Sequence, residues 1–236
     1  MQGVFITGTG TDVGKTYIGA AIARTLSAEG VNVIPRKPIE SGCIRDGEEL
    51  IPQDAVALKQ AAGFKGDLSE VCPYRFEPPI SPVRAAHLAN KVLTTEQLVS
   101  ICLQGSEHGF TLVEGAGGFY SPLAENGLNA DLAVALQLPV ILVADDKLGA
   151  LSNVLLNTEA IQMRGLQLAA VVLNEAQESN ADENMNNAAD LREHLDCPVF
   201  AIGYSSTEQP ELPRELIDSL MVMYQRGEDS HIKVAG

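Results

Sequence analysis

The glycine-rich stretch GTGTDVGKT at residues 8–16 contains residue types that bind phosphate. A phosphate-binding loop normally reads Gly, four residues, then Gly-Lys-Ser/Thr, so that backbone N–H groups and a lysine surround the anion. Here Thr9 stands where the first glycine belongs, with a glycine on either side. Lys15 would reach the β- and γ-phosphates of a nucleotide, and the Thr16 hydroxyl would ligate Mg²⁺. We interpret the stretch as a variant loop with one extra residue, against the alternative of an accidental turn with a surface lysine.

Acidic residues that could hold the metal follow two apolar runs. Glu114 ends the run TLVE, and the GAGG after it would let the backbone approach a ligand closely. Asp145 ends the run LPVILVAD and Asp146 follows it; both are rivals for the same role, although capping of the following helix is the simpler interpretation of them. Asp54 is ambiguous on its own, because aspartate is also a good helix N-cap.

A third cluster, KPIESG at residues 37–42, starts where an apolar strand has just ended. Lys37 taken alone could be an ordinary surface lysine. Beside a phosphate loop, a second lysine would stabilise charge on a transferring group. Ser41 could then hold a polar substrate by hydrogen bonding.

The elements that would position these residues follow from the hydrophobic pattern, in which short apolar runs alternate with longer periodic segments. The predicted strands cover residues 3–6, 31–34 (ending at Pro35), 111–114, 138–145, 168–174 and 198–202. The predicted helices run from Lys15 to Gly30, from Asp54 to Gly63, from a Thr94–Gln97 capping box to Gly105, and over 130–137, 152–164, 184–195 and 214–224. Residues 64–93 contain several prolines and are predicted to be irregular.

The uninterrupted apolar strands are typical of a sheet that is covered on both faces. The sequence therefore predicts an α/β fold of the P-loop NTPase type, with a doubly wound, mostly parallel sheet and helices on both faces. We expect a single domain over residues 1–236, with roughly the last ten residues flexible. Ligands of such sheets lie beyond the carboxyl ends of the strands, which would bring the three motifs to one rim.

The charge balance narrows the possible partners. Lys and Arg number 16 against 31 Asp and Glu, a formal net charge of -15, so a nucleic acid is not expected as a partner. The four cysteines are scattered without the close spacing of a zinc site. No secretory signal is recognised and no segment approaches the roughly 18 apolar residues of a membrane span, so we expect a cytoplasmic location without a membrane partner.

Taken together, these motifs resemble the dethiobiotin synthetase family. The resemblance lies in the ordered series GTGTDVGKT, KPIESG, QDAVAL, FEPPISP, LVEGAGGFYSPL, LPVILVADDKLGALSN and VVLNE, which covers roughly residues 3–175. The phosphate loop of that family has the same extended spacing, with a glycine six residues before its Gly-Lys-Thr.

The resemblance implies an ATP-dependent cyclo-ligase that converts 7,8-diaminononanoate, CO₂ and MgATP to dethiobiotin, ADP and phosphate. One amine would take up CO₂ as a carbamate, ATP would phosphorylate the carbamate to a mixed anhydride, and the second amine would close the ring. Phosphoryl transfer depends chiefly on positioning and charge neutralisation, which fits the loop, the lysines and the carboxylates.

Matching positions within the motifs implies a role for each residue of the site. Lys37, Lys15 and Thr11 would be catalytic, and Thr16, Asp54 and Glu114 would hold Mg²⁺. The implied nucleotide-site residues are Asp12, Val13, Gly14, Lys15, Thr16, Tyr17, Asp54, Glu114, Gly115, Ala116, Gly117, Asn174 (reading the adenine) and Glu175. The implied substrate-site residues are Ser41, Thr11, Lys37, Gly117, Gly118, Leu148 and Gly149.

The resemblance also implies a homodimer whose sites lie near the interface. Residues near Leu148–Asn153 are expected to help hold the carboxylate tail of the substrate, partly across that interface. This chain departs from the family pattern at Val83, at residues 151–153 and at residues 201–206, positions that concern tail and base recognition rather than reaction class. Glu40 is a small residue in many relatives, and the sequence assigns it no role.

Three alternatives stay open from the sequence. A cobyrinate-type amide synthase would need a further glutaminase domain, for which 236 residues leave no room. A partitioning-type ATPase switch often places a signature lysine at the start of the loop, where this chain has Ile6-Thr7. A relative that binds nucleotide without dethiobiotin activity would keep the loop while its tail-binding positions differ.

Overall fold

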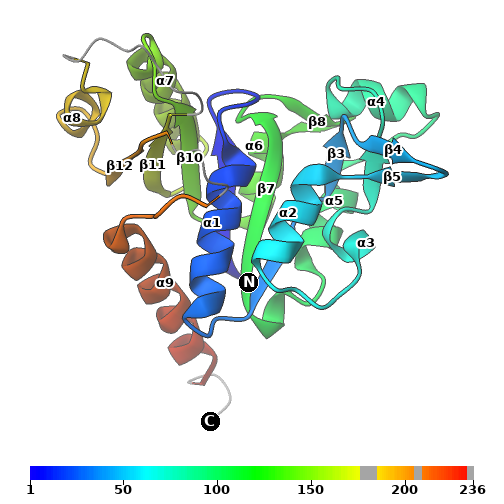
Figure 1. Ribbon diagram of the computed structural model, residues 1–236, viewed down its shortest axis with the longest axis horizontal. Coiled ribbons are helices and arrows are strands. Elements are labelled where there is room, and N and C mark those ends of the chain that lie inside the picture. The colour runs from blue at the N-terminus through cyan, green and yellow to red at the C-terminus, as the bar shows by residue number, and fades with distance from the viewer. Residues whose placement is uncertain (176–184, 205–208, 233–236) are drawn as a thin grey trace.

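The computed structural model describes residues 1–175, 185–204 and 209–232, with side chains described up to residue 225. Its centre is a six-stranded sheet in which every neighbouring pair of strands is parallel (Figure 1). The strand order is β12-β11-β10-β1-β7-β2. These strands are β1 (Gln2–Gly8), β2 (Val33–Arg36), β7 (Phe110–Gly118), β10 (Val140–Asp145), β11 (Leu168–Asn174) and β12 (Val199–Ile202). Because the chain moves from β1 first to one side and later to the other, the sheet is doubly wound, which confirms the predicted fold class.

Helices cover both faces of this sheet, as predicted. One face carries α1 (Lys15–Ala28), α2 (Gln53–Ala61) and α9 (Arg214–Ile232), which lie in front of the strands in Figure 1. The other face carries α5 (Thr95–Leu103), α6 (Asn129–Leu136), α7 (Ala150–Met163) and α8 (Asn187–Arg192). Side chains alternate between the two faces along β1. Val4 and Ile6 pack with the apolar side chains on the face of α1, and Phe5 packs with those on the face of α5. The sheet is therefore buried on both sides.

The segment predicted to be irregular contains short elements, so that prediction is wrong in part. It forms, with the chain before it, a lobe beside β2 and β7 (right in Figure 1). The lobe contains a parallel pair, β3 (Ile39–Ser41) with β6 (Tyr74–Phe76), an antiparallel hairpin, β4 (Ile44–Asp46) with β5 (Glu49–Ile51), and the helices α3 (Leu68–Val71) and α4 (Pro82–Leu88). Elements of three to seven residues are too short to produce a hydrophobic period. The remaining short elements are η1 (Ser106–His108), β8 (Pro122–Ala124) and β9 (Gly127–Leu128).

Several boundaries differ from the prediction for physical reasons. β2 continues through Pro35 to Arg36, because β2 is an edge strand, where a residue without an N–H is tolerated. β7 runs on to Gly118, and a register shift against β1 brings Gly8 opposite Gly118. Two predictions extend beyond the described residues. The helix predicted over 184–195 includes Asn184, and the departure from the family pattern at 201–206 includes residues 205–206. The backbone from residue 233 onward and the side chains from residue 226 onward also lie outside the described part. The predicted flexibility of roughly the last ten residues concerns this segment.

Arg36 fastens the edge strand to the helix behind it. Its side chain is only 2% exposed, and its guanidinium donates to the carbonyl oxygens of Ile101 (3.2 Å) and Gln104 (2.5 Å) at the C-terminal end of α5. A cation at that end also suits the helix dipole. These hydrogen bonds tie the end of β2, where Lys37 follows, to α5.

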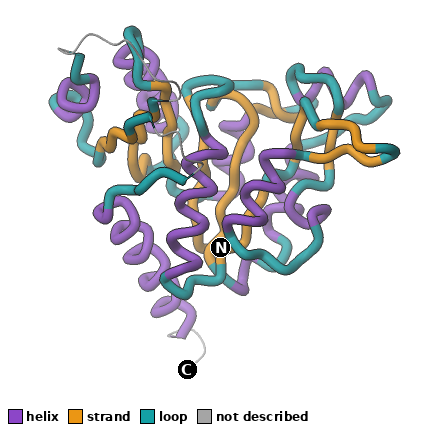
Figure 2. The backbone as a smooth tube through the Cα atoms, in the orientation of Figure 1, coloured by secondary structure: helices purple, strands orange, loops and turns teal. Residues whose placement is uncertain are grey.

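Loops gather at the edge of the sheet formed by the carboxyl ends of the strands, the upper edge in Figure 2. Within residues 1–175, 185–204 and 209–232, no helix combines the length and apolar character needed to cross a membrane.

Candidate active site

The phosphate-loop stretch connects β1 to α1 and closes over the start of the helix. Lys15, the first residue of α1, donates from Nζ to the carbonyl oxygen of Gly10 over 2.7 Å. Two residues of the loop have left-handed backbone conformations, Asp12 at φ 59° and Gly14 at φ 92°. Aspartate and glycine adopt that region more readily than other residues, and here they let the extended loop return to the helix.

A close neighbour also requires glycine at position 14. A Cβ at position 14 would lie 2.2 Å from Nδ2 of Asn174, and that same nitrogen donates to the carbonyl oxygen of Val13 over 3.2 Å. Asn174 ends β11 and is 2% exposed, and its Oδ1 has no hydrogen-bond partner among the described residues. The amide of Asn174 thus ties the loop to the sheet.

Lys37 lies between two carboxylates. Its Nζ donates to Oδ2 of Asp54 at 2.9 Å, to Oε1 of Glu114 at 2.5 Å and to the carbonyl oxygen of Gly115 at 3.2 Å. Burial alone would lower the pKa of Lys37, but the charges of Glu114 and Asp54 outweigh it and raise that pKa above its ordinary value. Lys37 is therefore held as an ammonium ion.

The loop joins the same carboxylates. Thr16 donates from Oγ1 to Oε1 of Glu114 at 2.9 Å, the oxygen that also accepts from Lys37. Glu114 is 1% exposed, whereas the side chain of Asp54 is 42% exposed. Burial would raise the pKa of Asp54, but the charge and hydrogen bond of Lys37, with a hydrogen bond from Thr16, lower it. Four sequence motifs, those of Thr16, Lys37, Asp54 and Glu114, thus meet at one point.

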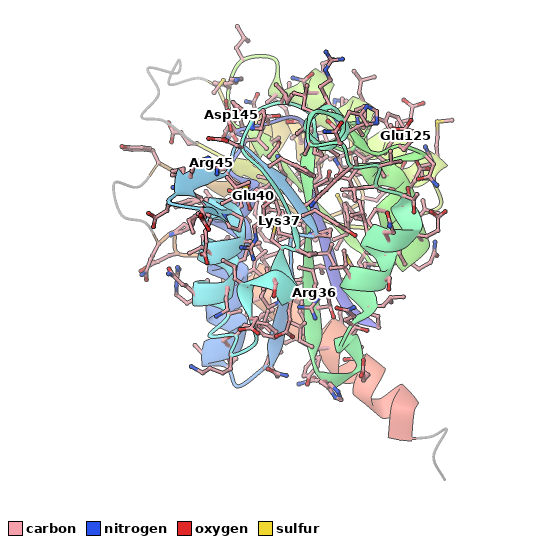
Figure 3. All side chains as sticks on the ribbon, turned by 90° about the vertical axis from the view of Figure 1, so that its right-hand side faces the viewer. Arg36, Lys37, Glu40, Arg45, Glu125 and Asp145 are labelled. Carbon is pink, nitrogen blue, oxygen red and sulfur yellow. The ribbon has the colours of Figure 1, made fainter. Side chains whose placement is uncertain are left out.

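Glu40 reaches α2 from outside the helix. Its Oε1 accepts from the backbone N–H of Asp54 at 3.1 Å and its Oε2 from that of Ala55 at 3.0 Å. Burial and the neighbouring Asp54 charge raise the pKa of Glu40 to about 7. Figure 3 shows Glu40 near Lys37, with Arg36 lower along the sheet and Asp145 apart from them. Asp54 is the second residue of α2 and not its N-cap, so the N-cap interpretation of Asp54 is wrong.

A buried asparagine shapes the strip GAGG after Glu114. Asn129 is fully buried, accepts from the N–H of Ala116 at 3.0 Å, and donates to the carbonyl oxygens of Ala116 and of Gly118, the latter at 2.9 Å. A Cβ at position 115 would lie 2.6 Å from its Oδ1, so glycine is needed there. The strip is held in one shape beside the phosphate loop.

Many of these groups line one cleft of about 860 Å³. The phosphate loop and part of the GAGG strip supply some of its wall, and the loop 79–82 supplies another part. Glu114, Gly115, Gly118 and Asn174 are not among its lining residues. The cleft is lined by Thr11, Asp12, Gly14, Lys15, Thr16, Tyr17, Lys37, Glu40, Ser41, Gly42, Gln53, Asp54, Pro79, Ile80, Ser81, Pro82, Ala116, Gly117, Ser121 and Pro122. Most of the predicted site residues are therefore brought together.

Other predicted residues lie elsewhere. Leu148 is 93% exposed and Gly149 is the N-cap of α7; neither lines the cleft. Val13 is buried inside the loop, and Glu175 follows β11 and accepts from the N–H of Tyr204 at 3.0 Å.

The rival metal ligands of the sequence also lie elsewhere. Asp145 pairs with Lys147 at 2.7 Å and Asp146 accepts from Asn187 at 2.7 Å, so neither caps α7 and neither lines the cleft.

Sequence reasoning missed the parts played by Glu40, Asn129 and the 79–82 wall. The proline-rich stretch FEPPISP was the visible signal for the wall. The hydrogen bonds of Glu40 and Asn129 cross 14 and 13 residues of chain, and no short-range pattern reveals such contacts.

Comparison with known proteins gives a consistent result. A family model described as an AAA domain matches residues 2–202. The chain is 38% identical over 199 residues to the ATP-dependent dethiobiotin synthetase BioD of Ruthia magnifica subsp. Calyptogena magnifica, covering 84% of this chain and 90% of that protein. It is 38% identical over 179 residues to the protein of the same name from Caulobacter vibrioides (strain NA1000 / CB15N), covering 75% and 81%.

Among solved structures, the cell division ATPase MinD of Pyrococcus furiosus matches with a TM-score of 0.55 and 15% identity, over 96% of this chain and 99% of that chain. At that identity the likeness extends to the fold alone.

Proposed function

The chain belongs to the family of ATP-dependent dethiobiotin synthetases, and we propose that it carboxylates 7,8-diaminononanoate with CO₂ and closes the ring to dethiobiotin at the expense of MgATP. The observation that carries this proposal is the position of Lys37, between Asp54 and Glu114 and beside the phosphate loop, in a single cleft. A lysine ammonium there can neutralise charge on a carbamate while the loop holds the phosphates.

The reaction consists of three steps. An amine nitrogen attacks CO₂, forms a C–N bond and loses a proton. A carbamate oxygen then attacks the γ-phosphorus, and the P–O bond to ADP breaks. The second amine attacks the carbamoyl carbon, forms a C–N bond and loses its proton, while the C–O bond to phosphate breaks and phosphate leaves with the electron pair of that bond. Lys15 would stabilise the β- and γ-phosphates, Lys37 the carbamate, and Thr11 would orient the reacting end.

Oxygen ligands of the kind that Mg²⁺ prefers lie in the cleft and directly beside it. They are the hydroxyl of Thr16 and the carboxylates of Asp54 and Glu114, whose Oε2 is buried without a hydrogen-bond partner among the described residues. No group of three His, Cys, Asp or Glu side chains suited to a metal occurs in the described ranges. Mg²⁺ commonly uses few protein ligands and completes its octahedron with phosphate oxygens and water. When bound, it would neutralise charge on the transferring phosphoryl group.

The two substrates would occupy different parts of the cleft. The backbone of residues 12–17 and of 115–117 would line the nucleotide. Asn174, whose buried Oδ1 has no hydrogen-bond partner among the described residues, and Glu175 would bind the base only if the end of the cleft opened toward β11. Thr11, Ser41, Gly117 and Gly118 would contact the diamine.

We propose that the chain is one cytoplasmic domain that works as a homodimer. Leu148 and Gly149 lie outside the cleft of their own chain, which supports a contribution to the site of a second copy. Size-exclusion chromatography with light scattering tests the dimer; a monomer at assay concentration would contradict it.

The decisive experiment is a product assay with purified protein, the diamine, bicarbonate and MgATP. We expect dethiobiotin by mass spectrometry and phosphate release that depends on both the diamine and bicarbonate. ATP turnover that ignores the diamine, without dethiobiotin, would favour a partitioning-type ATPase instead. Nucleotide binding with neither turnover nor product would favour a catalytically silent relative.

A further inference from the structure

Glu40 is a cleft residue to which the proposed reaction gives no part. It lies in β3 three residues after Lys37, and its side chain is only 5% exposed. A carboxylate that is withdrawn from water in this way needs partners, and its two oxygens have them in the N–H groups of Asp54 and Ala55.

The helix that Glu40 touches has no cap of its own. The N-cap of α2 is Pro52, whose side chain has no group that could accept from the first amides. The first N–H groups of a helix lack partners inside the helix and carry partial positive charge. A carboxylate supplied by β3 satisfies both needs at once.

The same contact fixes the orientation of Asp54. The backbone N–H of Asp54 is held by Glu40 at 3.1 Å, while its carboxylate is held by Lys37 at 2.9 Å. Lys37 is itself anchored through its N–H to the carbonyl oxygen of Val71 at 2.9 Å. Two contacts and the chain segment 37–40 therefore link the end of β2, the first turn of α2 and β3.

We propose that Glu40 is a positioning residue, which caps α2 from β3 and so sets the Asp54 carboxylate beside Lys37. The capping stands on the geometry alone, while its importance for catalysis rests on the proposed function.

The test compares Glu40→Ala and Glu40→Gln with Asn186→Ala. Asn186 accepts from the N–H of Ala189 at 3.1 Å and caps α8, away from the cleft, so its removal is a matched loss of a helix cap. In nucleotide-free protein, we expect the amides of Asp54 and Ala55 to exchange hydrogen about tenfold faster in Glu40→Ala than in the wild type. Glu40→Gln keeps one acceptor and should lie between the two; Asn186→Ala should leave both amides unchanged.

A second readout concerns the metal. Binding of Mn²⁺ in the presence of a non-hydrolysable ATP analogue, followed by electron paramagnetic resonance, should weaken about tenfold in Glu40→Ala. The kcat for dethiobiotin should fall by a similar factor, with a smaller change in KM for the diamine. Glu40→Gln should recover part of each loss, which a general loss of stability would not produce.

The outcomes are separable. Unchanged exchange at Asp54 and Ala55 would overturn the capping. Faster exchange with unaltered Mn²⁺ binding and kcat would overturn the positioning role. Absence of dethiobiotin from the wild-type protein would overturn the proposed function and leave the exchange result intact. If Glu40→Ala does not fold, the near-isosteric Glu40→Gln carries the comparison, and equal exchange in it and in the wild type overturns the proposal.

Discussion

Lys37 and Glu114 form a buried ion pair, with Nζ and Oε1 2.5 Å apart and side chains that are 3% and 0% exposed. The pair joins the residue after the edge strand β2 to the middle of β7, and Thr16 of α1 shares the same carboxylate oxygen. Loss of one partner would leave the other charge buried without its counter-ion. Substitution of either residue should therefore change both the charge available for catalysis and the local structure.

Lys37→Ala should abolish turnover while ATP binding is largely kept. The ammonium is proposed to act on the carbamate, so kcat should fall at least about 10³-fold, whereas the phosphate loop is untouched. Product analysis and calorimetric titration with ATP measure the two effects. Lys65→Ala, at an exposed lysine beyond α2, is the control. Retention of a tenth or more of the activity would refute the assigned role.

Lys15→Ala should weaken both ATP binding and turnover. Its Nζ now closes the loop through Gly10, and it is the group expected to reach the β- and γ-phosphates. Titration of the variant with ATP is the measurement. If ATP bound with undiminished affinity, the assignment of the stretch as a phosphate loop would be wrong.

Gly14→Ala should impair ATP binding far more than Gly30→Ala. Both glycines have positive φ, 92° and 87°, but a Cβ at position 30 meets open space, whereas at position 14 it meets Asn174. Each change should cost about 1 kcal/mol of stability through backbone strain, and only Gly14→Ala should also displace the loop. Adding Asn174→Ala removes the contact, so the double variant should lose less stability than the sum of the single variants. If the stability loss of the double variant equalled the sum of the two single losses, the close contact between the two residues would be contradicted.

Arg36→Leu should destabilise the protein by about 2–4 kcal/mol, because the carbonyl oxygens of Ile101 and Gln104 lose a charged donor. Arg45→Leu is the matched control: Arg45 pairs with Glu77 on the surface, with both side chains about half exposed, and its loss should destabilise the protein much less than the loss of Arg36. Urea unfolding measures the free energy of unfolding of each. Equal losses would mean that the buried arginine contributes no more than a surface pair.

The stability of the nucleotide-free protein should depend on pH through Glu40. Burial raises the pKa of Glu40 from 4.5 to about 7, so the native state holds this proton more tightly than the unfolded chain. That contribution is fully present below pH 4.5 and is lost as the pH rises through about 7. Glu40→Gln does not titrate there. The difference in free energy of unfolding between variant and wild type should therefore move by up to about 3 kcal/mol across this range, to the disadvantage of the wild type. A constant difference would refute the shift.

Much of the fold could be predicted because its signals are local. The runs LPVILVAD and LAAVVLN are long and uniformly apolar, which is typical of strands covered on both faces, and they became β10 and β11. Thr9, at the position of the usual first glycine, predicts an extended loop, and the left-handed Asp12 accommodates the added length. The convergence of Lys37 and Glu114 followed from the rule that ligands lie at the carboxyl ends of parallel strands.

What could not be predicted depends on contacts across the chain. Arg36 is buried because α5, about 65 residues further along the chain, packs over it. The local sequence VIPRK contains no signal for this burial. The predicted strand ends at Pro35 because proline interrupts a central strand but is tolerated in an edge strand. The sequence alone does not say which strand lies at the edge of the sheet. Glu40 acquired its part only when α2 was placed against β3.

The strand order also constrains how the chain can assemble as it is synthesised. β7 lies between β1 and β2 in the sheet although it follows both in the sequence. Until β7 has left the ribosome, the first two strands cannot take their final places, and Thr16 and Lys37 have no Glu114 to contact, 98 and 77 residues downstream. A nascent chain that ends before residue 114 therefore carries both lysines of the site but not the site itself.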